Sequence, residues 1–343
     1  MRQLFFNKLL YRLLRSPRTN KAEVLEQLIL AKEHDENAFY TLNGRPVTAN
    51  DFSYPAKTST NNQAIVMQGP LLLQDNFTFE TLKLYSKLIY PKLIILSTWE
   101  NEDASTLKQI ENLGITVLLN KLPEYSGNQN INLQIVSTYS GLIKAKELGA
   151  PYALKTRTDQ RIYSTISLQL FSNLLTTFPL TETGQKERLI ITSLATIKYR
   201  LYGAGDMLMY GNIEDMLNYW SVETDERRLE FKEAREYTIK ELSALRLGEM
   251  YLCSKYFEKL GYTLNWTLKQ SWDLIGKYFC VIDHSAIDLY WSKYDIRTEF
   301  KYKYYATHSL QCLTFADWLS LYLNKVTNYP EPYLDELFGQ KLI

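Results

Sequence analysis

The feature that most constrains the fold of this chain is an alternation of short apolar runs and longer amphipathic segments between residues 63 and 157. The apolar runs are QAIVMQGPLLL (63–73, broken at Gly69-Pro70), KLIILSTWE (92–100), ITVLLN (115–120) and the start of YALKTRTDQRIY (152–163). The intervening segments with helical periodicity are TFETLKLYSKLIYP (78–91), ASTLKQIENLG (104–114) and a long stretch ending near Gly149. This alternation predicts an α/β fold whose mainly parallel sheet is flanked by helices on both faces.

The pattern continues, less regularly, toward the end of the chain. Further strands are expected in RLIITSL (188–194), in GDMLMY (205–210), which runs into a helix, and in YFCVID (278–283). Further helices are expected over 21–34, in a charged stretch from about 222 to 245, in GEMYLCSKYFEKLG (248–261) and in TFADWLSLYLNKV (314–326). The C-terminal region is therefore expected to be largely helical.

Composition narrows the class of protein. The 39 Lys and Arg residues balance 38 Asp and Glu residues, and the net charge of +1 argues against a general nucleic-acid binder. Three cysteines without a CxxC pair, and only three histidines, argue against a zinc cluster and fit a reducing compartment. No apolar run reaches the ~18 residues that a membrane-spanning helix needs, so we expect none.

Residues 2–18 have the pattern of a short basic amphipathic helix. Their Phe and Leu residues share one broad face, and Lys8, Arg12 and Arg15 collect on the other. Such a helix either lies on a membrane surface or packs its apolar face on the protein, and the pattern leaves both interpretations open.

Polar residues follow the predicted strands at the point where each strand ends. In open α/β sheets, ligands bind at this carboxyl edge, where loops leave the sheet and helix N-termini face the crevice. The residues expected at this edge are Gln68, Gly69 and Pro70 after the first strand, Thr98 and Glu100 after the second, Asn120 after the third, and Arg157, Asp159 and Arg161 after the fourth. Two arginines beside one carboxylate suit a diphosphate, since guanidinium groups bind phosphate oxygens through two nitrogens. Taken alone, an RxDxR segment is more often an ordinary surface network of ion pairs than a ligand site.

Several stretches, in this order, resemble the WavE lipopolysaccharide synthesis family of glycosyltransferases. The stretches are AIVMQGP (64–70), TFETLKLY (78–85), IILSTWE (94–100), NINLQIVSTYSGLIKAKELGA (130–150), YALKTRTDQRIY (152–163), KYRLYGAGDMLMYG (198–211) and VIDHSAIDLYWSKY (281–294). The layout of a helix followed by a strand that ends in an acid is also similar to that of GT-A glycosyltransferases. The resemblance implies a GT-A-like domain over 61–343 after a helical extension and loop over 1–60. Within the domain, 61–165 would bind the nucleotide and 166–343 the acceptor.

The resemblance also implies roles for individual residues. In a GT-A-like enzyme Asp159 would hold a divalent cation, Mn²⁺ or Mg²⁺, on the donor diphosphate, and Gln68, Gly69 and Pro70 would border the nucleotide. Thr98 and Glu100 would contact its base or ribose, and Asn132 opens the helix that lies against the donor. Where GT-A enzymes have the first acid of an Asp-x-Asp pair, this chain has Arg157. A single carboxylate provides few ligands for a divalent cation. A metal-independent mechanism, in which Arg157 and Arg161 neutralise the diphosphate, is therefore an alternative.

Two carboxylates are candidates for the general base that an inverting transferase needs. Glu249 heads a predicted helix, where its alternative role is to stabilise the helix dipole, and Asp206 follows the glycine-rich turn YGAG. We favour Glu249 as the base and Asp206 as a sugar contact. His284 is a weaker candidate for a metal or phosphate contact, since a lone histidine is more often structural.

The expected function is transfer of a sugar from a nucleotide-diphosphate sugar to a lipopolysaccharide-core or capsule glycan, at the cytoplasmic face of the bacterial inner membrane. Residues 2–18 would supply peripheral membrane contact. Two alternatives are a polyol-phosphate or sugar-phosphate transferase on the same fold, and a non-catalytic glycan- or nucleotide-binding protein. No nucleic-acid partner is expected.

Overall fold

A computed structural model describes residues 21–36, 45, 47–49, 63–88, 93–181, 183–230, 236–292 and 311–323. The chain divides into two compact units, Met1–Pro46 and Val47–Ile343. In the first unit, helix α2 (Lys21–Glu36) confirms the helix expected over 21–34. The amphipathic helix expected over 2–18 lies outside the described residues.

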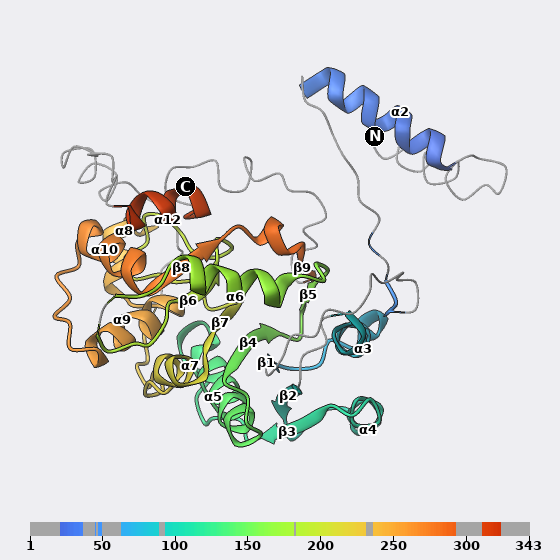
Figure 1. The fold of residues 1–343 in the computed structure, drawn as a ribbon, viewed down its shortest axis with the longest axis horizontal. Coiled ribbons are helices and arrows are strands. Elements are labelled where there is room, and N and C mark those ends of the chain that lie inside the picture. The colour runs from blue at the N-terminus through green and yellow to red at the C-terminus, as the bar shows by residue number, and fades with distance from the viewer. Residues whose placement is uncertain are drawn as a thin grey trace. The chain divides into compact units, whose positions relative to one another are not determined.

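The second unit is built on a seven-stranded sheet with the strand order β3-β2-β1-β4-β7-β6-β8 (Figure 1). Its strands are β1 (Gln63–Gln68), β2 (Leu93–Trp99), β3 (Thr116–Asn120), β4 (Tyr152–Arg157), β6 (Leu189–Thr192), β7 (Met209–Asn212) and β8 (Phe279–Ile282). All neighbouring pairs are parallel except those of β7, which runs antiparallel to both β4 and β6. Every residue of β1 is buried, as its unbroken apolar run predicts.

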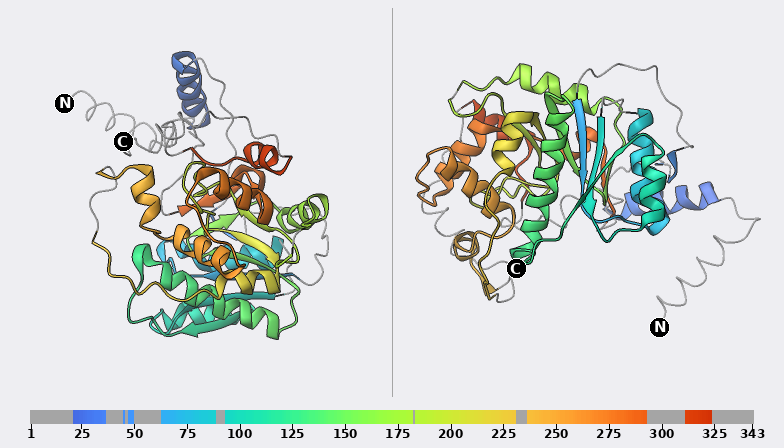
Figure 2. Two further views of the ribbon diagram at one scale, coloured as in Figure 1. Left: turned by 90° about the vertical axis from the view of Figure 1, so that its left-hand side faces the viewer. Right: turned by 90° about the horizontal axis from the view of Figure 1, so that it is seen from below.

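Helices cover both faces of this sheet (Figure 2). They are α3 (Phe77–Leu88), α4 (Ala104–Glu111), α5 (Ile131–Glu147), α6 (Ser167–Thr177), α7 (Ile213–Trp220), α8 (Ile239–Ala244), α9 (Glu249–Lys259), α10 (Leu268–Tyr278) and α12 (Phe315–Tyr322). Helix α5 packs closely on β1 because Gly141 has no side chain: a Cβ there would overlap Val66. Helix α6 packs on the opposite face, where Ser172 accepts a hydrogen bond of 2.7 Å from Gln63. The expected architecture, a mainly parallel sheet flanked by helices, is confirmed.

A second, two-stranded sheet lies beyond the end of β4. Strand β5 (Gln160–Ile162) pairs antiparallel with β9 (Leu289–Trp291), and the backbone N–H of Ser292 donates to the carbonyl of Asp159. This pairing places Trp291, from late in the chain, beside the acid that follows β4.

The charged stretch from 222 to 245 was predicted to be helical, and that prediction is wrong for most of the residues that the structure describes there, 222–230 and 236–245. Residues 221–230 form neither helix nor strand, and α8 is the only α-helix in the described part of the stretch. The cause is largely non-local: Asp225 binds Arg227 two residues later, but it also binds two asparagines from the α5 region, more than ninety residues earlier in the chain. Among the described helices, none has the length and apolar character needed to cross a bilayer.

Candidate functional site at the carboxyl edge of the sheet

Hydrogen bonds join the carboxyl ends of β1, β2 and β3 to helix α5. Ser137 of α5 donates to Oε1 of the buried Gln68 (2.8 Å), and Ser97 donates to the carbonyl of Ser137 (2.6 Å). Asn120 Nδ2 in turn donates to Ser97 Oγ (2.9 Å) and to the carbonyl of Thr98 (2.8 Å). The expected gathering of Gln68 and Asn120 at one edge is therefore what the structure has, and their polar atoms also hold α5 in place.

The turn after β1 brings the backbone close to the residues that follow β4. Gly69 has φ of +117°, which an L side chain rarely adopts, and a Cβ there would lie 2.9 Å from Thr158 Oγ1. Its N–H donates to the carbonyl of Ser97 (3.2 Å), and Thr158 N–H donates to the carbonyl of Gln68 (3.1 Å). Pro70 follows as an exposed residue. The glycine is therefore required by a close approach of two loops.

Thr98 and Glu100, expected to contact a nucleotide, have different environments. Thr98 is fully buried, and its hydroxyl donates to Glu102 Oε1 (3.1 Å). Glu100 is exposed, and its backbone N–H donates to the carbonyl of Asn120 (3.1 Å). Of the two side chains, Glu100 is the one that can reach a ligand.

Arg157 and Asp159 form a bidentate pair at the end of β4. Arg157 Nε lies 2.8 Å from Asp159 Oδ1, and Arg157 Nη2 lies 2.9 Å from Oδ2. Trp291 Nε1 also donates to Asp159 Oδ2 (3.1 Å). The two paired side chains keep 22% and 18% of their surface exposed. Burial alone would raise the pKa of Asp159, but the hydrogen bonds and charge of Arg157, with the bond from Trp291, hold the pKa below its ordinary value.

Arg161, the second arginine of the RxDxR segment, has a different environment. It is 3% exposed, and it donates to Thr81 Oγ1 (2.8 Å) and to the carbonyls of Phe77 (3.1 Å) and Val47 (3.0 Å). Its guanidinium lies 4.4 Å from the centroid of the Phe77 ring. Arg161 therefore ties β5 to α3, and a direct contact with a diphosphate would require it to give up these bonds.

Asp206 belongs to a buried polar cluster on the α5 face of the sheet. Gln134, in the first turn of α5, donates to Asp206 Oδ2 (2.7 Å). Lys155, in the middle of β4, donates to the backbone carbonyl of Asp206 and lies 3.4 Å from Gln134 Oε1. Burial lowers the pKa of Lys155 to about 7, against the opposing effect of Asp206. Asp206 is thus held by both its backbone and its side chain.

Glu249 is the first residue of α9, as expected for a helix-start carboxylate. Its Oε1 accepts a hydrogen bond from Arg200 Nη1, and the carboxylate side chain is 12% exposed. The residue before it, Gly248, has φ of +49°, and a Cβ there would lie 2.6 Å from Gln129 Oε1. The start of α9 therefore lies against the segment that leads into α5.

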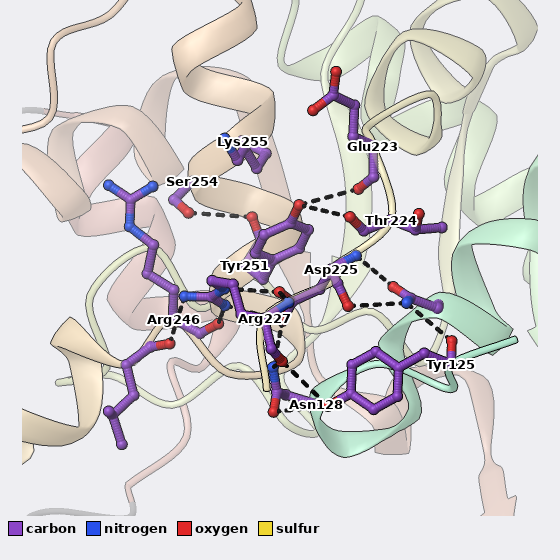
Figure 3. Close-up of polar contacts among 12 residues, drawn as sticks. Tyr125, Asn128, Glu223, Thr224, Asp225, Arg227, Arg246, Tyr251, Ser254 and Lys255 are labelled. Atoms are coloured by element: carbon purple, nitrogen blue, oxygen red, sulfur yellow. Dashed lines mark hydrogen bonds and ion pairs between the residues drawn. The ribbon is translucent and has the colours of Figure 1, made fainter. Parts of the chain in front are cut away.

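Asn132, expected to face the donor, is instead engaged with the segment 221–230. Figure 3 shows Asp225 and Arg227 of this segment beside Asn128. It is fully buried; its Nδ2 donates to the carbonyls of Tyr125 (3.1 Å) and Asp225 (3.0 Å), and its Oδ1 accepts from Asp225 N–H (2.6 Å). Asn128 donates to Asp225 Oδ2 (2.8 Å), and Arg227 binds the same carboxylate through Nε (2.7 Å) and Nη2 (3.0 Å). We call Asn128, Asn132, Asp225 and Arg227 the Asp225 cluster. Its polar contacts hold the α5 N-terminus.

The residues present do not fit a metal site well. Within the described part of the chain, no three His, Cys, Asp or Glu side chains lie close enough to hold a metal ion. Both oxygens of Asp159 already accept hydrogen bonds from Arg157. His284 begins the short helix η5 (His284–Ile287) and is partly exposed; from this part of the chain it is Trp291 that reaches Asp159.

Comparison with known proteins identifies the family. The family model described as WavE lipopolysaccharide synthesis matches residues 64–340. The chain belongs to the WavE lipopolysaccharide synthesis family. No curated protein matches this WavE chain.

Solved structures similar to this WavE chain are distant. A cytidylyltransferase from Leptospira borgpetersenii is 13% identical, with a TM-score of 0.36, over 82% of this chain and 99% of that one. Glucosyl-3-phosphoglycerate synthase from Mycobacterium tuberculosis, in complex with Mn²⁺, uridine diphosphate and phosphoglyceric acid, is 10% identical, with a TM-score of 0.30, over 60% and 81%. Mannose-1-phosphate geranyltransferase from Thermus thermophilus is 18% identical, with a TM-score of 0.27. The match covers 38% of this chain and 41% of that one, which is less than half of either.

Three features of the WavE chain near this edge were not expected from the sequence. Lys155 could have been noticed, because a lysine is unusual inside an apolar strand. It lies two residues before Arg157, so the two side chains must be on the same face of the strand. The position of Trp291 beside Asp159 could not have been predicted, because it depends on the pairing of β5 with β9 across about 130 residues of chain. The Asp225 cluster depends likewise on contacts between distant segments.

Proposed function

We propose that this WavE protein is a nucleotide-sugar-dependent glycosyltransferase, and that Arg157 binds the donor diphosphate. The observation that carries the proposal is the position of Arg157: it ends β4 directly beside Gln68 at the end of β1, partly exposed, with its guanidinium oriented by Asp159. Membership of a lipopolysaccharide synthesis family supports a glycan acceptor, for which we propose the lipopolysaccharide core or a capsule glycan.

In this proposal Asp159 is the residue that orients Arg157. Because the pKa of Asp159 is lowered, the carboxylate stays ionised at neutral pH and fixes the plane of the guanidinium. An incoming diphosphate competes for the same two nitrogens, and guanidinium groups bind phosphate oxygens in this bidentate manner. Gly69 leaves room for the ligand to approach the backbone after β1.

The chemical step requires a base for the acceptor hydroxyl, and we assign it to Glu249. The hydroxyl oxygen attacks the anomeric carbon, the bond from that carbon to the diphosphate oxygen breaks, and the proton passes to a Glu249 oxygen. Arg157 stabilises the negative charge that develops on the leaving diphosphate. Asp206, held by Lys155 and Gln134, is assigned to contact a sugar.

The proposal routes no step through a divalent cation. Asp159 is the single carboxylate at the expected metal position, and its oxygens are engaged by Arg157. Residues 61–165 would form the donor half and 166–343 the acceptor half. We place the enzyme at the cytoplasmic face of the inner membrane, where its buried cysteines, Cys253 and Cys280, would stay reduced.

A thermal-shift screen with UDP, GDP, CDP and ADP, and with their sugar conjugates, tests donor binding, because a ligand of the folded state raises the melting temperature. We expect at least one to stabilise the protein equally with EDTA and with Mn²⁺. A shift that EDTA abolishes would contradict the metal-independent step. No shift with any of these compounds would contradict the proposed function.

Transfer with the donor so identified tests the base. Glu249→Gln should lower kcat by about 100-fold or more, the usual size of a general-base contribution. Glu258→Gln is the matched control, since Glu258 lies in the same helix and also pairs with an arginine, Arg246. Equal activity of the two variants would remove Glu249 from the role.

A further inference from the structure

Lys155 is a buried lysine whose hydrogen-bond acceptors are both neutral. It is 0% exposed, its Nζ donates to the backbone carbonyl of Asp206 and lies 3.4 Å from Gln134 Oε1, and the ring centroid of Trp220 lies 4.9 Å away. Burying an ammonium group is costly unless an opposite charge pairs with it directly. A lysine kept at such a position is a candidate for a functional role.

The position of Lys155 couples it to Arg157. In register, Lys155 pairs with Val66 and Arg157 pairs with Gln68, and both lysine and arginine point to the face that α5 covers. Side chains two residues apart on one face of a strand are about 6.6 Å apart along the strand. A charge that arrives at Arg157 therefore acts on Lys155 at short range through the protein interior.

The charged groups around Lys155 are few. Asp206 and Asp159 raise its pKa and Arg157 lowers it, but burial dominates and brings the pKa to about 7. Helices α5 and α7 face it with the uncharged side chains of Gln134 and Trp220. At pH 8 the free protein thus holds Lys155 mainly as the neutral amine.

We propose that Lys155 takes up one proton from solvent when a nucleoside diphosphate binds at Arg157. The amine lone pair accepts the proton, –NH₂ becomes –NH₃⁺, and no covalent bond to the ligand forms. Two effects act in the same direction: the anion attracts the new charge, and it cancels the repulsion from the Arg157 guanidinium. The ammonium form donates more strongly to the Asp206 carbonyl, so donor binding would tighten the loop that carries Asp206. This inference rests on the proposed function, which supplies the diphosphate at Arg157.

Isothermal titration calorimetry of the full chain at pH 8 tests this coupling. UDP, GDP, CDP and ADP are titrated in two buffers that differ in ionisation enthalpy, and the difference in measured heat gives the protons taken up. Near pH 8 the nucleotide phosphates are already ionised, so their own uptake is small. We expect about 0.5–1 proton per diphosphate bound by the natural protein.

Two substitutions remove the titrating amine in different ways. Lys155→Met has no amine, and Lys155→Arg stays charged at all working pH values, so both should bind without proton uptake. If the methionine variant does not fold, the arginine variant decides. Lys108→Met, which removes a lysine whose side chain is 72% exposed, is the control and should keep the uptake.

The outcomes separate the two proposals. Binding with uptake that disappears in the Lys155 variants supports the inference. Binding without uptake, or uptake that persists in either Lys155 variant, overturns the inference and leaves the proposed function standing. Absence of binding by all four nucleotides overturns the proposed function, and the inference with it.

Discussion

Two arginine–aspartate pairs with the same spacing occupy different surroundings in this protein. In each pair the two residues are separated by one position, and the guanidinium binds the carboxylate through two nitrogens: Arg157 with Asp159, and Arg227 with Asp225. Asp225 is 0% exposed, whereas the Asp159 side chain keeps 18% of its surface exposed. The carboxylate is closed to solvent in one pair and open in the other, although the Arg227 side chain keeps 36% of its surface exposed and that of Arg157 keeps 22%.

The difference lies in what surrounds each guanidinium. Arg227 also donates to the carbonyls of Leu245 (3.0 Å) and Arg246 (2.7 Å), and Asn128 binds the opposite side of Asp225. Arg157 instead ends a central strand, where the loops leave the sheet. A ligand can compete for Arg157 without dismantling a helix terminus, whereas displacing Arg227 would release the start of α5. The position of each arginine–aspartate pair in the fold, and not its sequence spacing, therefore distinguishes the candidate ligand site at Arg157 from the structural contact at Arg227.

The largest effect is expected on stability, from Arg227→Met. This change leaves the buried carboxylate of Asp225 without its cation, so the free energy of unfolding should fall by about 3 kcal/mol in urea denaturation. Arg228→Met is the matched control: Arg228 is exposed and lies over the Tyr125 ring, so its loss should cost under about 1 kcal/mol. Equal losses for the two variants would show that the Asp225 cluster is not the structural link described here.

The next effect is expected on catalysis, from Asp159→Asn. The amide no longer holds the Arg157 guanidinium in two ionic bonds, so kcat/KM for transfer should fall by about 100-fold, equivalent to about 2.7 kcal/mol. The free energy of unfolding should change by less than about 1 kcal/mol, because the pair is partly exposed. Asp225→Asn should give the reverse result, with a large loss of stability and near-normal kcat/KM per folded molecule. If Asp159→Asn and Asp225→Asn have the same effects on stability and on kcat/KM, the distinction between the two pairs is wrong.

The smallest effect is expected on acidification. Burial would raise the pKa of Asp225, but hydrogen bonds from Arg227 and Asn128 lower it below the ordinary value. A lowered folded-state pKa contributes stability that is present above the unfolded pKa and is lost as the pH falls through the folded pKa. The difference in unfolding free energy between the natural protein and Asp225→Asn should therefore shrink as the pH falls below about 4. A difference that grows on acidification would contradict the assigned shift.

How much of this could be predicted from the sequence depends on how local each feature is. Strands β1, β2 and β4 follow from apolar runs that are buried on both faces, and the partly exposed edge strand β3 follows from a shorter apolar run. All four were predictable, as was Glu249 at the start of α9. The antiparallel course of β7 and the pairing of β5 with β9 are set by contacts between segments far apart in the chain.

The same distinction explains the candidate residues. Gln68, Gly69 and Arg157 were placed correctly at one edge because strand ends are a local property. Asn132 and Arg161 were expected at the same edge, but their side chains form hydrogen bonds with residues far away in the sequence. Asn132 binds Asp225, and Arg161 binds the α3 segment. The helix expected over 222–245 failed for the same reason, since the partners of Asp225 lie almost a hundred residues earlier.

The central claim is that Arg157, and not the equally well-paired Arg227, binds the donor diphosphate. Calorimetric Kd values for the best-binding nucleoside diphosphate, measured on the natural protein, Arg157→Gln and Arg227→Met, test it most directly. We predict a Kd raised at least tenfold, about 1.4 kcal/mol, for Arg157→Gln, and an unchanged Kd for the folded fraction of Arg227→Met. An unchanged Kd in Arg157→Gln would contradict the claim.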